Sequence, residues 1–408
     1  MNIWYLSKYA QSPLDGSPTR QYFFAKEFAK KGHNVSLVYS RSNGNNKIPI
    51  MGLTNQITRY YEGVSIVRLK GPLINLGFNI KRIYSWLIFE IRLLYWALFK
   101  SQEKPDVIIV SSLSLLTFLN GIFLKKHFKC KLICEIRDIW PLTIIESNNL
   151  NKHSPIIRFL SYVEKKGYKY ADKIVGSMGN LKEHIVNTNR EFVDKVEYIP
   201  TGFDKDFYNS NTILTPELNS FFDSIPKKNF IIGYAGTIGK ANCVDEIINV
   251  ANCFQNDSVS FVIIGDGVLK DKLELQVRSL NLKKVHFLGR YPKNKIPTIL
   301  KKCDILLNPW LSGVSTYKYG LSPNKWIEYM YSARPIIVSV DGYQNIINEA
   351  NCGMFIKAGD IVAMVDAINY YRSLNKFELD KIGQNGKEYL LNNLTYSKLA
   401  QKYINLME

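Results

Sequence analysis

The stretch FIIGYAGTIGKANCVDEIINVANCFQNDSVSFVIIG, residues 230–265, decides the fold. The apolar run Phe230–Tyr234 predicts a strand, the helical spacing of Val244–Cys253 predicts a helix, and Ser260–Gly265 predicts a second strand. A strand, a helix and a strand in this order are the unit from which parallel sheets are built. We therefore expect a parallel sheet covered by helices in this part of the chain.

The same alternation extends from this stretch in both directions. Toward the C-terminus it predicts helix Val268–Ser279, strand 285–289, helix Lys295–Lys301, strand 304–310, helix Asn324–Ser332, strand 335–340, and helices from there to residue 408. Toward the N-terminus it predicts strand Asn2–Leu6, helix Gln21–Lys31, strands His33–Tyr39, Asp106–Ser111, Lys131–Ile136 and Asp172–Ser177, and a helix from near Asn180. The expected class is α/β, with two Rossmann-like, doubly wound parallel-sheet domains.

A boundary between the two domains is expected near the middle of the 408 residues. The segment YIPTGFDKDFY, Tyr198–Tyr208, interrupts the alternation with Pro, Gly and Asp. It predicts domains at 1–203 and 204–392, with a C-terminal helix at about 393–408 that can pack back on the first domain. Ligands of parallel sheets bind at the carboxyl ends of the strands, so we expect the two domains to face each other across a cleft.

The composition indicates a globular, basic protein. A hydrophobic content of 46% excludes wholesale disorder, and the net charge is +18. Residues 1–204 hold 29 Lys+Arg against 16 Asp+Glu, and the remainder holds 24 against 19, so the first half carries most of the excess. This excess predicts an anionic partner. The six cysteines form no C-x-x-C pair, which argues against a zinc site, and the N-terminus does not resemble a signal peptide.

The segment Ile80–Phe99 does not have the pattern of an ordinary surface helix, because it is apolar nearly all round. A membrane-spanning helix would place Glu90 and Arg92 mid-bilayer, where Arg costs about 2.5–3.5 kcal/mol. Two interpretations stay open. The helix is either buried against the sheet, or it lies at a membrane interface, where tryptophans and basic residues are favoured. The basic first half slightly favours the membrane.

Several loops in the second half suit an anion. GYAGTIGK, Gly233–Lys240, leaves a strand, and its glycines allow the backbone to approach a phosphate while Lys240 supplies charge. IIGDG, Ile263–Gly267, has the same form, although such a segment is often only a tight turn. Arg290 directly follows a strand, where it is either a ligand-facing cation or simply an exposed arginine.

The most informative segment is YKYGLSPNKWIEYMYSARPIIVS, Tyr317–Ser339. Its Ser-Pro pair predicts a helix start, so the free amides near Asn324 and Lys325 can point at an anion. Glu328 follows Lys325 by three residues, on the same helix face. Its carboxylate can accept from the two hydroxyls of a ribose, which together with the amides suits a nucleoside diphosphate. The alternative is a salt bridge between Glu328 and Lys325.

Taken together these motifs resemble the family 4 glycosyltransferases, which have the two-domain GT-B fold. The resemblance covers nearly the whole chain, and the segments that carry it are the N-terminal Gly loop, IPTGFD, GYAGTIGK, GDG, LGR and SPNKxxEYM. RDIWP, Arg137–Pro141, and the YG-SPNK pattern look like bacterial enzymes that build surface polysaccharides, including N-acetylfucosaminyl transferases.

The resemblance implies roles for individual residues. It assigns Lys240, Lys325, Arg137 and Asp138 to catalysis, the last two near the sugar hydroxyls, although Asp138 can instead cap a turn. It assigns donor binding to a larger set: Gly16, Gly236, Thr237, Lys240, Arg290, Ser322, Asn324, Lys325 and Glu328.

Two further features complete the implied site. The family's first glutamate falls at Gly320 in this sequence, so its role is either dispensable or taken by Tyr317, Lys318 or Tyr319. Asp204-Lys205-Asp206 resembles an Asp-x-Asp metal motif, but it lies in the interdomain loop and is expected to be structural. The resemblance implies no metal and no other cofactor.

The implied activity is retaining transfer of a sugar, an N-acetylhexosamine or its deoxy form, from a UDP-sugar to a lipid-linked saccharide in O-antigen or capsule synthesis. The implied partners are the UDP-sugar donor, a polyprenyl-diphosphate-linked acceptor and the cytoplasmic face of the inner membrane, which the first domain would contact. The alternative is a UDP-sugar 2-epimerase of the same fold. Nucleic-acid binding is disfavoured, because the basic residues are scattered.

Overall fold

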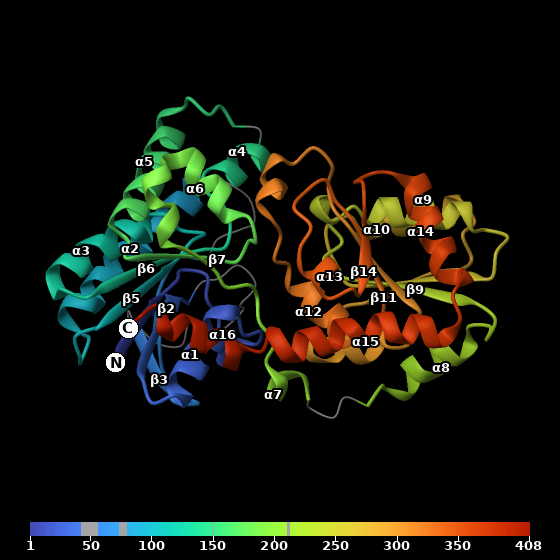
Figure 1. The fold of residues 1–408 in the computed structure, drawn as a ribbon, viewed down its shortest axis with the longest axis horizontal. Helices are drawn as coiled ribbons and strands as arrows, with labels where there is room; N and C mark the ends of the chain where they lie inside the picture. Colours follow the sequence, from blue (N-terminus) through green and yellow to red (C-terminus); the bar gives the residue numbers. More distant parts are fainter. Residues whose placement is uncertain (42–55, 73–79, 149, 210–212) are drawn as a thin grey trace. The chain divides into compact units, whose positions relative to one another are not determined.

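The structure is a computed structural model that describes residues 1–41, 56–72, 80–148, 150–209 and 213–408. The chain divides into two compact units (Figure 1). The first unit comprises Met1–Gly202 together with Tyr396–Glu408, and the second comprises Phe203–Thr395.

The first unit is built on a sheet that has eight strands in the described residues, in the order β3-β4-β2-β1-β5-β6-β7-β8. The strands are β1 (Asn2–Leu6), β2 (Asn34–Ser40), β3 (Gln56–Tyr61), β4 (Val64–Leu69), β5 (Val107–Ser111), β6 (Lys131–Ile136), β7 (Lys173–Gly176) and β8 (Val196–Tyr198). Its helices are α1 (Arg20–Lys30), α2 (Ile80–Phe99), α3 (Leu116–Phe128), α4 (Leu142–Asn148), α5 (Pro155–Tyr170), α6 (Leu181–Asn189) and α16 (Tyr396–Asn405). All strand pairs are parallel except β3 with β4.

The second unit is built on a sheet that has six strands in the described residues, all parallel, in the order β11-β10-β9-β12-β13-β14. The strands are β9 (Phe230–Ala235), β10 (Val259–Ile264), β11 (Val285–Gly289), β12 (Ile305–Pro309), β13 (Ile336–Ser339) and β14 (Gly353–Ile356). Its helices are α7 (Lys205–Tyr208), α8 (Pro216–Ser224), α9 (Val244–Cys253), α10 (Lys270–Ser279), α11 (Ile296–Leu300), α12 (Asn324–Tyr331), α13 (Ile346–Glu349), α14 (Ile361–Ser373) and α15 (Lys376–Asn393). Two doubly wound parallel sheets confirm the expected fold class.

The continuous apolar runs form strands because both sheet faces are covered by helices. In β12 the side chain of Leu306 packs into one core cluster, whereas its neighbours Ile305 and Leu307 pack into another. Successive side chains of a strand point to opposite faces, so each cluster lies on one face of the sheet. Both clusters consist of buried, mainly aliphatic and aromatic side chains, so the sheet has a hydrophobic core on each face.

The segment after α15 packs in the first unit, where α16 lies beside α1 (Figure 1). The ring of Tyr396 stacks on Phe23 at 4.9 Å, and Tyr403 contacts the rings of Phe24 and Phe28 at 5.2 and 5.6 Å. Aromatic pairs of this kind add about 0.5–1.5 kcal/mol each beyond the area that they bury. The segment Tyr396–Glu408 is therefore part of the first unit's core.

Four of the described strands, β3, β4, β8 and β14, are absent from the sequence expectation. Only helices are expected after strand 335–340, but Gly353–Ile356 forms the parallel edge strand β14. It is only four residues long and half-buried, so its hydrophobic pattern is too short to distinguish from a helix. The antiparallel hairpin of β3 and β4 was not predicted either. In β3 the side chains from Thr58 to Tyr61 are exposed, so this strand lacks an apolar run.

Helix α2 combines a buried and an exposed apolar face. Its buried face includes Trp86, Phe89, Leu93 and Trp96, each at most 4% exposed. Its outward side chains are Tyr84, Leu87, Ile91, Tyr95 and Phe99, which are 49–70% exposed. The face with Trp86 and Trp96 therefore packs against the protein, as the buried interpretation expects. The opposite face is exposed, as the interfacial interpretation expects. In the described part of the chain no helix is long and apolar enough to span a bilayer.

Candidate functional site

Most of the residues expected to bind a donor nucleotide lie in the second unit, at the carboxyl edge of its sheet. The loops after β9, β10 and β11 leave neighbouring strands of this edge, and α12 follows the loop after β12. In open parallel sheets ligands bind at this edge. The topology thus gathers the sequence motifs on one side of the second unit.

The two glycine-rich loops are packed directly on each other. The Gly236 amide donates to the Ile264 carbonyl at 2.9 Å, and the Ile238 amide donates to the Asp266 carbonyl at 2.9 Å. Gly265 has a φ of +146°, and a Cβ at this position would overlap the carbonyl oxygen of Gly236. Glycine is required there because any side chain would push the two loops apart. The GDG motif therefore supports the loop that contains Gly236 and Thr237.

Lys325 lies at the start of α12, and its ammonium reaches under the loop after β9. Its Nζ donates to Asn242 Oδ1 at 2.7 Å and lies 5.0 Å from the ring centre of Tyr234 and 5.2 Å from that of Trp310. Burial lowers the pKa of Lys325 to about 7, although Glu328 and Cys243 oppose this shift. Lys325 is thus a desolvated ammonium beside two aromatic faces, which is a favourable geometry for a cation.

The sequence analysis did not identify Asn242, Tyr234 or Trp310. Tyr234 Oη donates to the Thr237 carbonyl at 2.9 Å, which fixes the glycine loop above the lysine. The indoles of Trp310 and Trp326 both donate to Asn308 Oδ1, at 3.1 and 2.6 Å. Asn242 could have been predicted as a site residue, because it follows the predicted site residue Lys240 by only two positions. The hydrogen bond between Trp326 and Asn308 joins separate elements, and no helical or strand spacing in the sequence predicts it.

Glu328 is buried one turn after Lys325 but is not paired with it. Its Oε1 accepts from Tyr208 Oη at 3.0 Å and lies 3.7 Å from Lys293 Nζ. Burial raises the pKa of Glu328, and Lys293, Tyr208 and Lys325 each lower it. The salt bridge between Glu328 and Lys325 that the spacing allows is therefore not formed. Tyr208 ends the segment YIPTGFDKDFY, and the sequence analysis assigned this tyrosine no role in the site.

The other predicted donor-binding residues occupy the loops around Lys325. Lys240 and Thr237 are exposed on the loop after β9, and Arg290 is exposed directly after β11. Ser322 is half-buried and Asn324 is exposed at the start of α12. The structure brings Lys325 against the loop of Lys240 through Asn242, and it places Arg290 at the end of β11, beside the GDG loop.

Gly320 stands where the family resemblance places its first glutamate. Its backbone has φ +105° and ψ 162°, a conformation that side-chain-bearing residues rarely adopt. Of the three alternatives named from the sequence, Tyr319 is buried and Lys318 is exposed with its Nζ over the Tyr319 ring. Tyr317 contacts Trp310, with ring centres 5.6 Å apart, and so lies nearest to the Lys325 cluster.

The remaining predicted residues, Gly16, Arg137 and Asp138, lie in the first unit. Gly16 has a φ of +103° in the loop after β1. Arg137 and Asp138 follow β6, where the Arg137 amide donates to Ser112 Oγ at 2.8 Å. Burial raises the pKa of Asp138, and the Arg137 guanidinium opposes this. These residues lie at the carboxyl edge of their own sheet.

The Asp204-Lys205-Asp206 pattern has a structural explanation. Asp204 caps α7, and its Oδ1 accepts from the Phe207 amide at 2.7 Å. Among the described residues, no three His, Cys, Asp or Glu side chains are grouped so that they could hold a metal ion.

Comparison with known proteins identifies the class. The family model described as Glycosyltransferase Family 4 matches residues 15–207, and the one described as Glycosyl transferases group 1 matches residues 217–389. A probable glycosyltransferase of Pseudomonas aeruginosa, WbjE, is 22% identical over 335 residues, or 79% of each chain. The chain is therefore a glycosyltransferase, and its two parallel-sheet units are those of the GT-B fold.

The particular family follows from the same matches: the chain belongs to the family 4 glycosyltransferases, as the sequence motifs predicted. A Campylobacter jejuni enzyme is 28% identical over 178 residues, 43% of this chain and 44% of its own. Its name describes an α-1,4-N-acetyl-D-galactosaminyltransferase that acts on a saccharide linked to PP-undecaprenol. The structure of Anabaena HepE in complex with UDP-glucose has a TM-score of 0.68 at 13% identity and covers 99% of this chain and 98% of its own.

Proposed function

We propose that this enzyme transfers a sugar from a UDP-sugar, with retention of configuration, to a saccharide carried on a polyprenyl diphosphate. The sugar is an N-acetylhexosamine or its deoxy form, and the product is a bacterial surface polysaccharide such as O-antigen or capsule. The Campylobacter relative acts on such a carrier, and the Anabaena neighbour binds UDP-glucose. Both observations support the proposal.

The observation that carries the donor assignment is the desolvated ammonium of Lys325 beneath the loop after β9. In this proposal Lys325, Lys240 and Arg290 neutralise the departing diphosphate, without a metal ion. One cation at about 4 Å stabilises such a charge by about 4 kcal/mol at an effective dielectric of 20. Because the hydrogen bond to Asn242 holds Lys325 before the donor arrives, little reorganisation is needed in the transition state.

We assign the ribose to Glu328 and the phosphates to the first-turn amides at Ser322, Asn324 and Lys325. Gly236 and Thr237 line the phosphate path, and Tyr317 takes the place that the absent first glutamate leaves at Gly320. The assignment of Gly16, Arg137 and Asp138 to the transferred sugar rests on the family resemblance.

The experiment is a panel of UDP-sugars, with membrane extract as the acceptor source and UDP release as the measured product. We expect one N-acetylated UDP-sugar to release UDP only when extract is present. Conversion of UDP-N-acetylglucosamine without any acceptor would instead identify a 2-epimerase. Substituting Lys240 or Lys325 with Ala should lower kcat, and unchanged turnover in both variants would contradict the leaving-group role.

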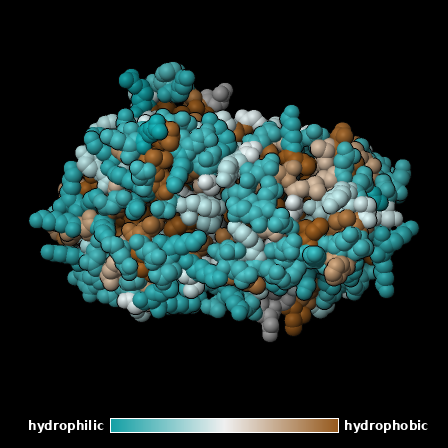
Figure 2. Space-filling view, in the orientation of Figure 1, coloured by the Kyte–Doolittle hydropathy of each residue, from teal (hydrophilic) through white to brown (hydrophobic). Residues whose placement is uncertain are grey.

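We further propose that the first unit binds the cytoplasmic face of the inner membrane through α2, α3 and α5. Helix α3 packs against both α2 and α5. We define the apolar face as the exposed apolar side chains of these three helices: Tyr84, Leu87, Ile91, Tyr95, Phe99, Leu119, Phe123, Phe159 and Tyr162. Lysines occur among them, with Lys166 Nζ 5.2 Å from the Tyr162 ring. In Figure 2 most of the visible surface is hydrophilic, and exposed hydrophobic residues interrupt it. Apolar side chains together with basic residues suit anionic headgroups.

Sedimentation with vesicles tests this contact. At low salt we expect binding to phosphatidylglycerol vesicles and weaker binding to phosphatidylcholine vesicles. Ile91→Glu should reduce binding at least about tenfold, because it places a carboxylate in the apolar face. Val268→Glu is the matched control, since Val268 is 84% exposed in the second unit. Equal binding by the two variants would contradict the assigned surface.

A further inference from the structure

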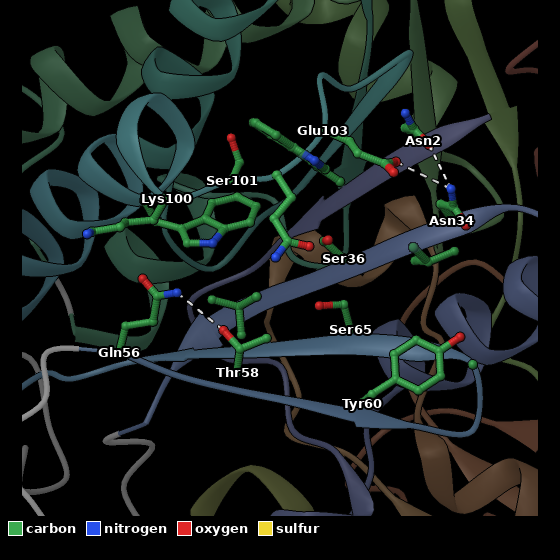
Figure 3. A pocket seen from close by; sticks show the side chains of 16 residues that line it. Asn2, Asn34, Ser36, Gln56, Thr58, Tyr60, Ser65, Lys100, Ser101 and Glu103 are labelled. Carbon is green, nitrogen blue, oxygen red and sulfur yellow. Dashed lines mark hydrogen bonds between the residues drawn. The ribbon is translucent and has the colours of Figure 1, made fainter.

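The first unit contains a polar cavity away from the carboxyl edge of its sheet. Its volume is about 390 Å³, within the range of about 300–1,000 Å³ typical of ligand sites. It lies over the face of β1, β2, β4 and β3 and is bounded by the turn after α2 (Figure 3). None of the predicted donor-site residues lines it.

The strand register explains why this face is polar. Trp4 is paired with Ser36, Ser36 with Ser65, and Ser65 with Tyr60, so these side chains share one face of the sheet. Thr58 lies two residues before Tyr60 and points the same way. A covering helix would require large apolar residues at these positions. The two serines leave the face open instead, and Figure 3 shows them in the middle of the cavity.

The lining residues combine an aromatic floor with neutral hydrogen-bonding walls. Trp4 and Trp96 are only 3% and 4% exposed, with ring centres 4.8 Å apart, and they form the floor. Tyr60 is 78% exposed at the rim. The polar walls consist of amides and hydroxyls: Asn2, Asn34, Ser36, Gln56, Thr58, Ser65, Ser101 and Gln102. Amides both donate and accept hydrogen bonds, and so do hydroxyls.

The charges at this cavity are balanced. Lys100 and Glu103 come from the turn after α2, and Glu103 Oε2 accepts from Asn34 Nδ2 at 3.3 Å. Asn34 Nδ2 also donates to Asn2 Oδ1 at 3.2 Å, which fixes both amides at one end of the cavity. An anionic ligand would meet Glu103 as well as Lys100. A neutral, hydroxyl-rich ligand fits this lining better than a phosphate does.

We propose that this cavity is a second saccharide-binding site, which holds a short segment of neutral glycan. The hydroxyls of the glycan would exchange hydrogen bonds with the amide and hydroxyl walls, and one sugar ring would pack its C–H face on Tyr60. No residue assigned to the donor lines this cavity, and the proposal does not depend on which UDP-sugar the enzyme uses. It gives a polysaccharide-building enzyme a place to hold the chain that it extends.

The test is saturation-transfer NMR of the full chain with chitotriose and with maltotriose, each at millimolar concentration. We expect transfer to at least one trisaccharide, and this transfer should persist when UDP is added in excess. No transfer to either sugar, or displacement by UDP, would overturn the proposal.

Two variants localise the binding. Ser65→Tyr fills the middle of the cavity and should weaken binding at least about tenfold, and Tyr60→Ala should weaken it about threefold. Ser279→Tyr makes the same change as Ser65→Tyr on the exposed end of α10 and should bind like the wild type. Circular dichroism must show that all variants are folded. Equal binding by folded Ser65→Tyr and Ser279→Tyr would overturn the assignment to this cavity.

Discussion

Lys325 has a lower pKa than an ordinary surface lysine. Burial disfavours its charged form and lowers its pKa to about 7, so the free enzyme loses this charge as the pH rises through neutrality. A bound diphosphate would favour the ammonium and raise this pKa again. Donor binding should therefore take up a proton at Lys325 above pH 7, and the affinity for UDP should fall as the pH rises beyond 7.

Calorimetry of UDP binding at pH 7.5, in buffers of different ionisation enthalpy, measures this uptake. Lys325→Met should remove this proton uptake and weaken UDP binding at least about tenfold. The corresponding loss of binding free energy is smaller than the attraction of about 4 kcal/mol between two charges at about 4 Å and an effective dielectric of 20. Lys302→Met, at an exposed lysine, is the control. If wild type and Lys325→Met exchange the same number of protons, Lys325 does not contact the diphosphate.

Substitution of Glu328 tests whether its carboxylate serves donor binding or the stability of the fold. Its folded pKa is raised by burial, so its contribution to stability is present below its unfolded pKa of about 4.5 and is lost as the pH rises through the folded pKa. Glu328→Gln removes the buried charge but keeps an acceptor for Tyr208. At pH 7 we expect an unchanged or higher Tm and a donor KM raised at least about tenfold. A lower Tm with an unchanged KM would show that the carboxylate serves the fold.

At the scale of single residues, the sequence predicted identities better than contacts. Lys325 and Glu328 lie on one helix, α12, as the sequence predicted, and their donor-binding roles stay a prediction. Their partners Asn242 and Tyr208 could not be predicted, because they lie 83 and 120 residues away in sequence. Burial decides the protonation of both groups, and burial depends on the whole fold.

At the scale of elements, the glycine loops give a sharp prediction. Gly265→Ala should destabilise the second unit by about 2–3 kcal/mol, because its Cβ would overlap the Gly236 carbonyl oxygen. Gly239→Ala should cost less than about 1 kcal/mol, because its Cβ would meet only Thr237 Cγ2, at 3.7 Å. Urea unfolding measures both variants. Equal destabilisation would show that the contact between the loops does not support the fold.

Elements with a strong local pattern were predicted to within one or two residues. Strands β1 and β6 and helix α9 have the expected bounds, because their apolar spacing is decided locally. Strands β3 and β14 were missed for the opposite reason, since one is exposed and the other is four residues long. Helix α2 was ambiguous from sequence because both of its faces are apolar, and only the packing of Trp86 and Trp96 shows which face is inside.

At the scale of the whole molecule, the first unit needs the segment Tyr396–Glu408. Deleting it would expose Phe23, Phe24 and Phe28 of α1 to water. We expect calorimetry of the truncated protein to lose the unfolding transition of the first unit while the transition of the second unit, Phe203–Thr395, remains. Two intact transitions would show that α16 is dispensable.

This return of the chain also constrains the enzyme's synthesis. Ribosomes add about 5–20 residues per second, so the 193 residues of Phe203–Thr395 take roughly 10–40 s to make. Throughout that interval the nascent first unit lacks the aromatic rings that cover α1. The half of the protein that is translated first therefore completes its folding last, and during that time its uncovered phenylalanines are a natural target for chaperones.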